Sequence, residues 1–283
     1  MIGLLHPGEM GAAVGQCLTT AGYQVLWASE GRGPQTAARA RDAGLTDVRT
    51  VRRVATEAKL ILSICPPHAA LDVAWAVHGF AGLYLDANAI APGTAREVAQ
   101  LITGSGGRYV DGGIIGPPPV TPGSTRLYLS GPDSAEVATL FRDTPLEPRI
   151  AAGTDTAASA VKMAYAAWTK GSAALLLTAR ALAHAEGVEE TLLAEWASSQ
   201  PHLADQFARA ARSAVTKGWR WVGEMEEIAQ CMAGDGLPDG FHQAAAEIFR
   251  RCPRLPGDTS ADHAAAAVLS AVTDGWPVPD ASA

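Results

Sequence analysis

Hydrophobic and polar positions alternate between two periods along the first 150 residues. Short apolar runs, typical of buried β-strands, recur at residues 2–5, 23–28, 60–65, 83–86, 109–110 and 127–129. Most gaps between them carry helix start or stop signals, and segments 36–44, 67–79 and 92–102 are examples. Strands that alternate with helices predict an α/β domain with a mainly parallel, doubly wound sheet. Runs with almost no polar interruption fit strands that helices cover on both faces.

The pattern changes after Gly153, where strand signals nearly vanish. Thr154 or Asp155 can cap a helix that continues without a breaker to about Glu186. Further helices are predicted at residues 189–199, 202–216, 219–233, 240–251 and 260–272. We therefore predict two domains, an α/β domain at 1–152 and an all-α domain at 153–283, joined by the long interdomain helix. The tail from Asp274 is rich in Pro and Ala and is expected to be loose.

The first strand leads into a glycine-containing turn that opens a helix. A G-x-G-x-x-G frame would place His6, Gly8 and Gly11 at its three glycine positions, so His6 stands where the first glycine is expected. Gly8 lets the backbone approach a pyrophosphate, which the positive end of the helix also attracts. The residues expected to contact a dinucleotide here are Pro7, Gly8, Glu9 and Met10. A plain strand–turn–helix is the alternative, but the position on the first strand of a βαβ run favours a Rossmann-type domain.

The end of the second predicted strand indicates which dinucleotide is bound. Ser29 and Arg32 suit the 2′-phosphate of NADP, whereas Glu30 suits the ribose hydroxyls of NAD. We expect NADP in preference to NAD. The alternative for Arg32 is a solvated charge on the loop. Cys65 and Pro66 end another strand, and we expect them to flank the nicotinamide half of the cofactor.

Asn88 follows the next strand and is assigned to the same end of the cofactor. Its side chain can bond the ribose or the carboxamide of the nicotinamide nucleotide. The alternative is an Asx turn before Pro92.

Composition and charge narrow the class of partner. A formal net charge of −7 and the lack of any Lys/Arg-rich run argue against nucleic acid. The four cysteines lack metal-ligand spacing, so we expect no metal and read them as reduced thiols of a cytoplasmic protein. No basic segment precedes the first strand, and no run of about 18 apolar residues occurs, so neither a signal peptide nor a membrane span is expected.

Several motifs together resemble a known family. They are Gly3-Leu4-Leu5, Gly8-Glu9-Met10-Gly11, Asp86-Ala87-Asn88-Ala89-Ile90-Ala91-Pro92, Asp111-Gly112-Gly113-Ile114-Ile115-Gly116 and Lys162 on the first helix of the second domain. In this order they resemble the β-hydroxyacid dehydrogenases of the 6-phosphogluconate dehydrogenase-like superfamily, over nearly the whole chain. Residues 29–32 and 162–171 look closest to a subgroup whose helical C-terminal domain has no known function.

The resemblance implies hydride transfer between a nicotinamide and the hydroxyl or carbonyl carbon of a small acid. Lys162 stands where the family has its general acid/base, and an ammonium there can stabilise and protonate a developing alkoxide. The alternative is a surface lysine on an Ala-rich helix, although Lys162 borders an apolar stripe. The resemblance also implies a homodimer built through the helical domains.

Two departures from the family pattern concern the substrate. The family often has Asn three or four residues after the lysine, where this chain has Tyr165 and Ala166. Three prolines, Pro117 to Pro119, follow Gly116 and have no N–H, so Ile115 and Gly116 are the remaining amide donors for a carboxylate. The candidate substrate-binding residues are Ile115, Gly116, Tyr165 and Lys170, the last as a second cation or a solvent-facing charge.

Three functions remain open from the sequence. The first is an NADP-dependent oxidoreductase for a small acidic or carbonyl-bearing substrate, with Lys162 as general acid/base. The second is an imine reductase-type NADPH enzyme, a class that shares this two-domain plan but usually lacks the lysine. The third is a nucleotide-binding protein without turnover.

Overall fold

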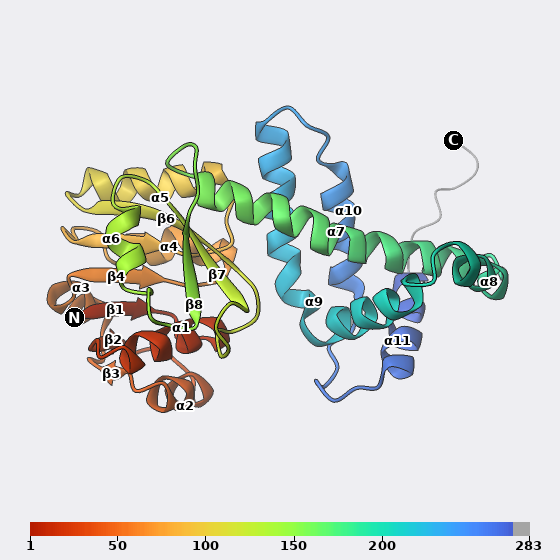
Figure 1. The fold of residues 1–283 in the computed structure, drawn as a ribbon, viewed down its shortest axis with the longest axis horizontal. Helices are drawn as coiled ribbons and strands as arrows, with labels where there is room; N and C mark the ends of the chain where they lie inside the picture. Colours follow the sequence, from red (N-terminus) through yellow and green to blue (C-terminus); the bar gives the residue numbers. More distant parts are fainter. Residues whose placement is uncertain (274–283) are drawn as a thin grey trace. The chain divides into compact units, whose positions relative to one another are not determined.

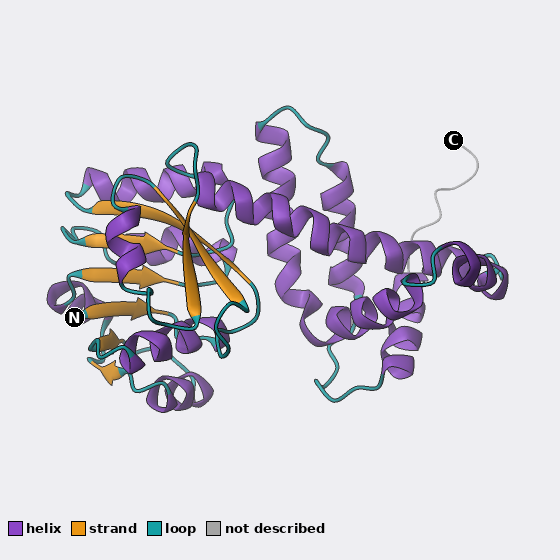
Figure 2. Ribbon diagram, in the orientation of Figure 1, coloured by secondary structure: helices purple, strands orange, loops and turns teal. Residues whose placement is uncertain are grey.

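Eight strands form one sheet in the computed structural model, which describes residues 1–273 (Figures 1 and 2). The strand order is β3-β2-β1-β4-β5-β6-β7-β8. All neighbouring pairs are parallel except β6 and β7, which are antiparallel. The strands are β1 (Ile2–Leu5), β2 (Val25–Trp27), β3 (Thr46–Asp47), β4 (Leu60–Ser63), β5 (Leu83–Asp86), β6 (Arg108–Ile115), β7 (Thr125–Ser130) and β8 (Leu146–Ile150). The predicted α/β domain with a mainly parallel sheet is thus confirmed.

Helices cover both faces of this sheet. They are α1 (Glu9–Thr20), α2 (Pro34–Asp42), α3 (Val51–Glu57), η1 (Pro67–Ala69), α4 (Ala70–Trp75), α5 (Pro92–Gly104) and α6 (Ser134–Thr139). Consecutive side chains of β1 pack into different hydrophobic clusters. Leu4 packs with α1, and Leu5 packs with α3, α4 and α5. This two-sided burial explains why β1, β4 and β5 are almost continuously apolar.

Four short elements do not appear in the sequence prediction. Strands β3 and β8 and helices α3 and α6 span two to seven residues, too few to show a hydrophobic period. Strand β8 reads Leu-Glu-Pro-Arg-Ile and ends the sheet order. An edge strand tolerates proline because one row of its backbone donors needs no partner strand.

The second half of the chain is helical, as predicted. Its helices are α7 (Ala157–Ala185), α8 (Glu189–Ser199), α9 (Leu203–Gly234), α10 (Gly240–Arg251) and α11 (Ala261–Thr273). The backbone contacts divide the chain into units Met1–Ala164 and Tyr165–Ala283, so the division falls within α7. The boundary at 152/153 inferred from the sequence lies before that helix. The predicted tail from Asp274 lies outside the described residues.

Helix α9 is one helix where the sequence predicts two, which corrects the expected break near Gly218. A Cβ atom on Gly218 would lie 3.5 Å from a ring carbon of Phe249 in α10, so Gly218 is a packing position. Burial against Phe249 offsets the modest helix propensity of glycine, and the helix continues.

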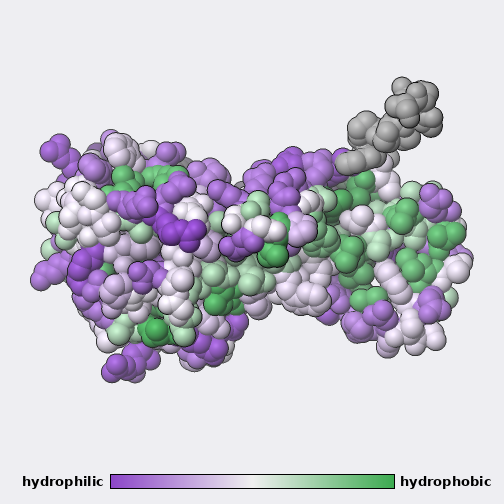
Figure 3. All heavy atoms as spheres, turned by 90° about the horizontal axis from the view of Figure 1, so that it is seen from above, coloured by the Kyte–Doolittle hydropathy of each residue, from purple (hydrophilic) through white to green (hydrophobic). Residues whose placement is uncertain are grey.

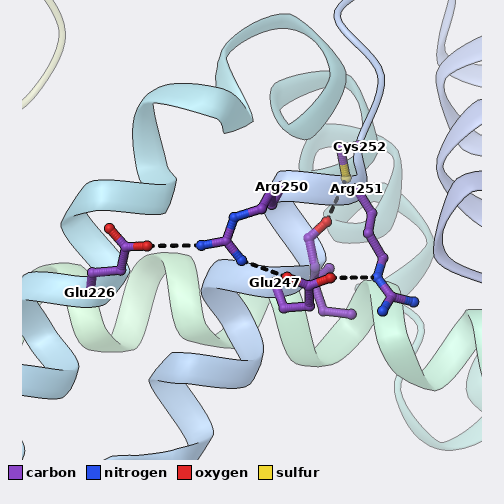
Figure 4. Close-up of polar contacts among 6 residues, drawn as sticks. Glu226, Glu247, Arg250, Arg251 and Cys252 are labelled. Carbon is purple, nitrogen blue, oxygen red and sulfur yellow. Dashed lines mark hydrogen bonds and ion pairs between the residues drawn. The ribbon is translucent and has the colours of Figure 1, made fainter. Parts of the chain in front are cut away.

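Arginines and glutamates join α9 to α10 (Figure 4). Arg250 bonds Glu226 of α9 at 2.8 Å and Glu247 of its own helix at 2.5 Å, and Arg251 bonds Glu247 at 3.0 Å. Most of these side chains are exposed, so each pair adds less than about 1 kcal/mol. Burial raises the pKa of the neighbouring Cys252 thiol to about 12, which keeps it protonated and unreactive.

The helical unit presents large hydrophobic side chains to solvent (Figure 3). Trp168, Leu175 and Leu182 project from α7, and Phe241 projects from α10. Exposed apolar side chains of this size are typical of surfaces that pack against another molecule. Within residues 1–273, no helix is both long and apolar enough to cross a membrane.

Candidate functional site

The strand order reverses direction at β1, which lies between β2 and β4. Ligands of open α/β sheets bind beyond the carboxyl ends of the strands at such a point. The loops that follow β1, β2, β4 and β5 carry His6, Arg32, Cys65 and Asn88 respectively. Three of these four residues, all except His6, are candidates from the sequence analysis.

The turn after β1 leaves an open approach to the N-terminus of α1. Gly8 occupies the N-cap position in an extended conformation, and no side chain caps the helix. No heavy atom lies within 4 Å of a Cβ built on Gly8, whereas a Cβ on Gly11 would lie 2.4 Å from the His6 carbonyl oxygen. Gly11 therefore permits the tight turn, and Gly8 leaves room for a ligand above the helix end.

His6 contacts Arg32 across this edge of the sheet. Its Nε2 lies 2.6 Å from Nη1 of Arg32, and its Nδ1 lies 3.4 Å from Nη2. Burial, followed by the positive charge of Arg32, lowers the pKa of the His6 imidazole to about 4. At neutral pH the ring is uncharged and accepts a hydrogen bond from the guanidinium. The sequence alone gives His6 no role, because a lone residue at a glycine position does not reveal its partner.

A pocket of about 250 Å³ opens beside this pair. Its lining is largely apolar and consists of Leu5, His6, Arg32, Val51, Ala69, Asp72, Val73 and Ala76. An apolar hollow with a few polar groups at its rim is typical of a small-molecule site.

Residues 29–32 form the turn that brings Arg32 to the pocket. The Arg32 amide donates to the Ser29 carbonyl oxygen at 3.0 Å, and Gly31 adopts a φ of +72°. The Ser29 amide donates to the Asp47 side chain at 3.2 Å, which anchors the turn to β3. Glu30 is exposed, while Arg32 is partly buried.

Asn88 and Cys65 are brought together by side-chain hydrogen bonds. The Asn88 Oδ1 accepts from the Cys65 amide at 2.6 Å, and its Nδ2 donates to the Ser63 hydroxyl at 3.1 Å. The Asx turn belongs to Asp86, whose Oδ1 accepts from the Asn88 amide at 3.0 Å. Asn88 thereby fixes the loop after β4, and its direct contact with a cofactor stays a prediction. Burial, followed by the charge of Asp86, raises the pKa of the Cys65 thiol to about 12, so Cys65 is no nucleophile.

A buried carboxylate anchors the start of α7 to the sheet. Asp111 of β6 accepts hydrogen bonds from the Ser159 amide at 2.8 Å, the Ser159 hydroxyl at 2.5 Å and the Ser130 hydroxyl at 2.9 Å. Burial raises the pKa of Asp111, and these hydrogen bonds oppose that rise. In the sequence, Asp111 belongs to a motif but has no evident role, because neither serine is near it in the chain.

Lys162 lies one turn beyond this anchor, against Gly113 of β6. A Cβ on Gly113 would lie 2.7 Å from the Ala158 carbonyl oxygen and 3.0 Å from the Lys162 Cβ. The missing side chain lets α7 approach the strand, and the approach sets the position of Lys162. The lysine side chain is partly buried.

The proline-containing loop after β6 is held by its own hydroxyls. The Thr125 hydroxyl donates to the Pro117 carbonyl oxygen at 2.5 Å, and the Ser124 hydroxyl donates to the Thr121 carbonyl oxygen at 2.7 Å. Gly116 has a φ of +130°, and a Cβ there would lie 2.5 Å from the Ser124 carbonyl oxygen. Ile115 is buried in β6. The loop is thus a fixed turn, and only glycine fits at position 116.

Tyr165 and Lys170 belong to the second unit. Tyr165 is about half exposed, at 47%. Lys170 forms an ion pair with Glu224 of α9, and its Nζ lies 5.8 Å from the ring centroid of Trp221. Both members of the pair are largely buried, so Glu224 offsets the positive charge expected of Lys170. Within residues 1–273, no cluster of His, Cys, Asp or Glu has the arrangement of a metal site.

Comparisons with known proteins show what the fold is similar to. The family described as "Domain of unknown function (DUF1932)" matches residues 183–252. The structure of MTH1747, a conserved protein of unknown function with structural similarity to 3-hydroxyacid dehydrogenases, is 28% identical and has a TM-score of 0.67. The match covers 88% of this chain and 96% of that one. The chain therefore shares the fold of 3-hydroxyacid dehydrogenase-like structures, and its residues 183–252 match the DUF1932 model.

Two further structures share the fold. Mycobacterium tuberculosis 3-hydroxyisobutyrate dehydrogenase with L-serine is 18% identical over 96% of this chain and 97% of that one, with a TM-score of 0.69. An imine reductase from Myxococcus stipitatus in complex with NADP+ is 20% identical over 88% and 93%, with a TM-score of 0.58. No curated protein matches the chain. The resemblance inferred from the sequence, including its helical C-terminal domain of unknown function, is confirmed.

Proposed function

We propose that this protein is an NADP-dependent oxidoreductase that transfers a hydride between nicotinamide and a small hydroxy acid or carbonyl compound. The observation that carries the proposal is the pocket at the switch point of the sheet. It joins the turn after β1 to Arg32 after β2. An uncapped helix end and an arginine at these two places suit a pyrophosphate and a ribose 2′-phosphate.

The residues of this edge fit such a cofactor. The space above Gly8 admits a pyrophosphate, to which the backbone amides of Glu9 and Met10 at the start of α1 would donate, with Pro7 and Gly8 in contact beside it. The apolar walls of the pocket suit an adenine ring, and Ser29 and Arg32 would hold the 2′-phosphate. Cys65, Pro66 and Asn88 would border the nicotinamide half, through a loop that Asn88 already fixes.

Lys162 is assigned the acid/base role. A bound nicotinamide supplies or accepts the hydride. During carbonyl reduction the Lys162 ammonium would stabilise the negative charge that develops on oxygen and give that oxygen a proton. During oxidation the neutral amine would take the hydroxyl proton. The close packing of α7 on Gly113 fixes the Lys162 Cβ beside β6, and the side chain would reach the substrate from that point.

The substrate is small, with Ile115, Gly116, Tyr165 and Lys170 as its candidate contacts. An imine reductase-type activity is the second candidate, favoured by two observations. Glu224 offsets the charge of Lys170, and the prolines after Gly116 give no amide donors, so this chain offers a carboxylate few partners. We also propose a cytoplasmic homodimer that packs through the exposed apolar side chains of the helical unit.

The proposal is tested by calorimetric titration of the full chain with NADPH and NADH. We expect NADPH to bind at least about 10-fold more tightly, because a charge-assisted arginine–phosphate contact adds about 1.5–3 kcal/mol. Arg32→Ala should weaken NADPH binding by about 10- to 100-fold and leave NADH unchanged. Arg41→Ala removes the same charge from an exposed position on α2 and should change neither affinity. Absence of binding by either nucleotide would refute the proposed function.

A further inference from the structure

We propose that His6 is a positioning residue that holds the Arg32 guanidinium for the 2′-phosphate and so sets the preference for NADP. The inference rests on the proposed function and adds to it a residue at a position where the fingerprint has glycine. It stands on the juxtaposition of the His6 ring, the Arg32 guanidinium and the pocket that both residues line.

The backbone of His6 is the first reason. His6 adopts a φ of +64°, one of two positive values among the non-glycine residues described in 1–273. A side chain in this left-handed region costs about 1 kcal/mol relative to glycine. Glycine would adopt the same turn at a lower conformational free energy. We infer that the contact made by the imidazole offsets the backbone strain at His6.

The geometry of that contact is the second reason. The two ring nitrogens lie 2.6 Å and 3.4 Å from Nη1 and Nη2, so the guanidinium lies along the N–C–N edge of the ring. Arginine has five N–H donors and no acceptor, and a neutral imidazole can accept at one nitrogen. One bond restrains the arginine, which lines the pocket and has further N–H donors for a ligand.

The charge of the pair is the third reason. A carboxylate in place of His6 would orient Arg32 but also cancel its charge, as Glu224 does for Lys170. The neutral His6 ring orients the Arg32 guanidinium without neutralising its positive charge. The other titratable group of the pocket lining is Asp72 of α4. Because the pKa of His6 is lowered to about 4, the ring stays a neutral acceptor throughout the physiological range.

The test uses two probes that differ in the 2′-phosphate, adenosine 2′,5′-bisphosphate and AMP, titrated calorimetrically into the full chain. His6→Gly should weaken binding of the bisphosphate by about 5- to 20-fold, because one hydrogen bond to a charged group is lost. The affinity for AMP should stay within about twofold. His6→Gln keeps an acceptor and should retain most of the preference. Thermal unfolding of His6→Gly should occur at the same or a higher temperature, because glycine relieves the backbone strain.

A double-mutant cycle separates positioning from a general effect on the pocket. In an Arg32→Ala background, His6→Gly should change neither probe's affinity. Equal weakening of both probes, or an unchanged effect of His6→Gly without Arg32, would overturn the inference while leaving the proposed function intact. If the unaltered protein binds neither the probes nor NADPH, both are overturned together.

Discussion

Lys162→Met is expected to lower kcat by about 10²- to 10⁴-fold while the affinity for NADPH stays unchanged. Methionine keeps the length and apolar stem of the side chain, so the packing of α7 on Gly113 is preserved. The substitution removes the ammonium that would protonate the substrate oxygen. Turnover of NADPH, followed by its absorbance, measures kcat, and calorimetry measures the affinity.

The matched control is Lys59→Met. Lys59 is exposed and precedes β4, at the amino end of the strands and opposite the proposed site. This variant loses the same charge and should keep full activity. If Lys162→Met retains wild-type kcat with the best substrate, another group provides the proton.

Asp111→Ala is expected to destabilise the α/β unit by about 3 kcal/mol. Its carboxylate accepts three hydrogen bonds from Ser130 and Ser159, and alanine would leave these buried donors without their acceptor. The same bonds fix the first turn of α7, so the variant should also lower kcat through Lys162. Unfolding by denaturant measures the free energy of unfolding of the variant and the wild type.

Asp111→Asn is the matched variant, since its amide keeps one acceptor in place and carries no charge. We expect a loss below about 1.5 kcal/mol. Because the folded pKa of Asp111 lies above its unfolded value, the wild type gains stability as pH falls through the folded pKa. The asparagine variant lacks this gain, so the wild type should become more stable relative to the variant as the pH falls through the folded pKa of Asp111. Equal losses for Ala and Asn at every pH would contradict this explanation.

The parts of the fold that the sequence predicts are those with a long, regular pattern. Apolar runs such as Leu60–Ser63 reveal buried strands, and the Ala-rich stretch after Gly153 reveals helices. Strand β8 is hidden because an edge position allows Glu147 and Pro148. The continuity of α9 is hidden because a local glycine signal at Gly218 is overruled by packing on Phe249.

The site divides in the same way. Motifs that depend on local backbone, such as Gly8 and Gly11, are readable because a turn and a helix end require them. Contacts between residues far apart in the sequence cannot be predicted from it. His6 and Arg32 are 26 positions apart, and Asp111 and Ser159 are 48 apart. Glycine in place of His6 would look more ordinary in sequence, and only the folded chain shows what the imidazole touches.

We propose above all that this protein transfers a hydride from NADPH. The most direct test incubates the protein with NADPH deuterated at both C4 positions and a panel of small keto acids, aldehyde acids and cyclic imines, and measures deuterium in the products by mass spectrometry. We predict one deuterium per molecule of product for the carbonyl compounds and a sharp loss with Lys162→Met. Transfer to imines alone would favour the second candidate function. Tight NADPH binding with no deuterium in any product would contradict the account.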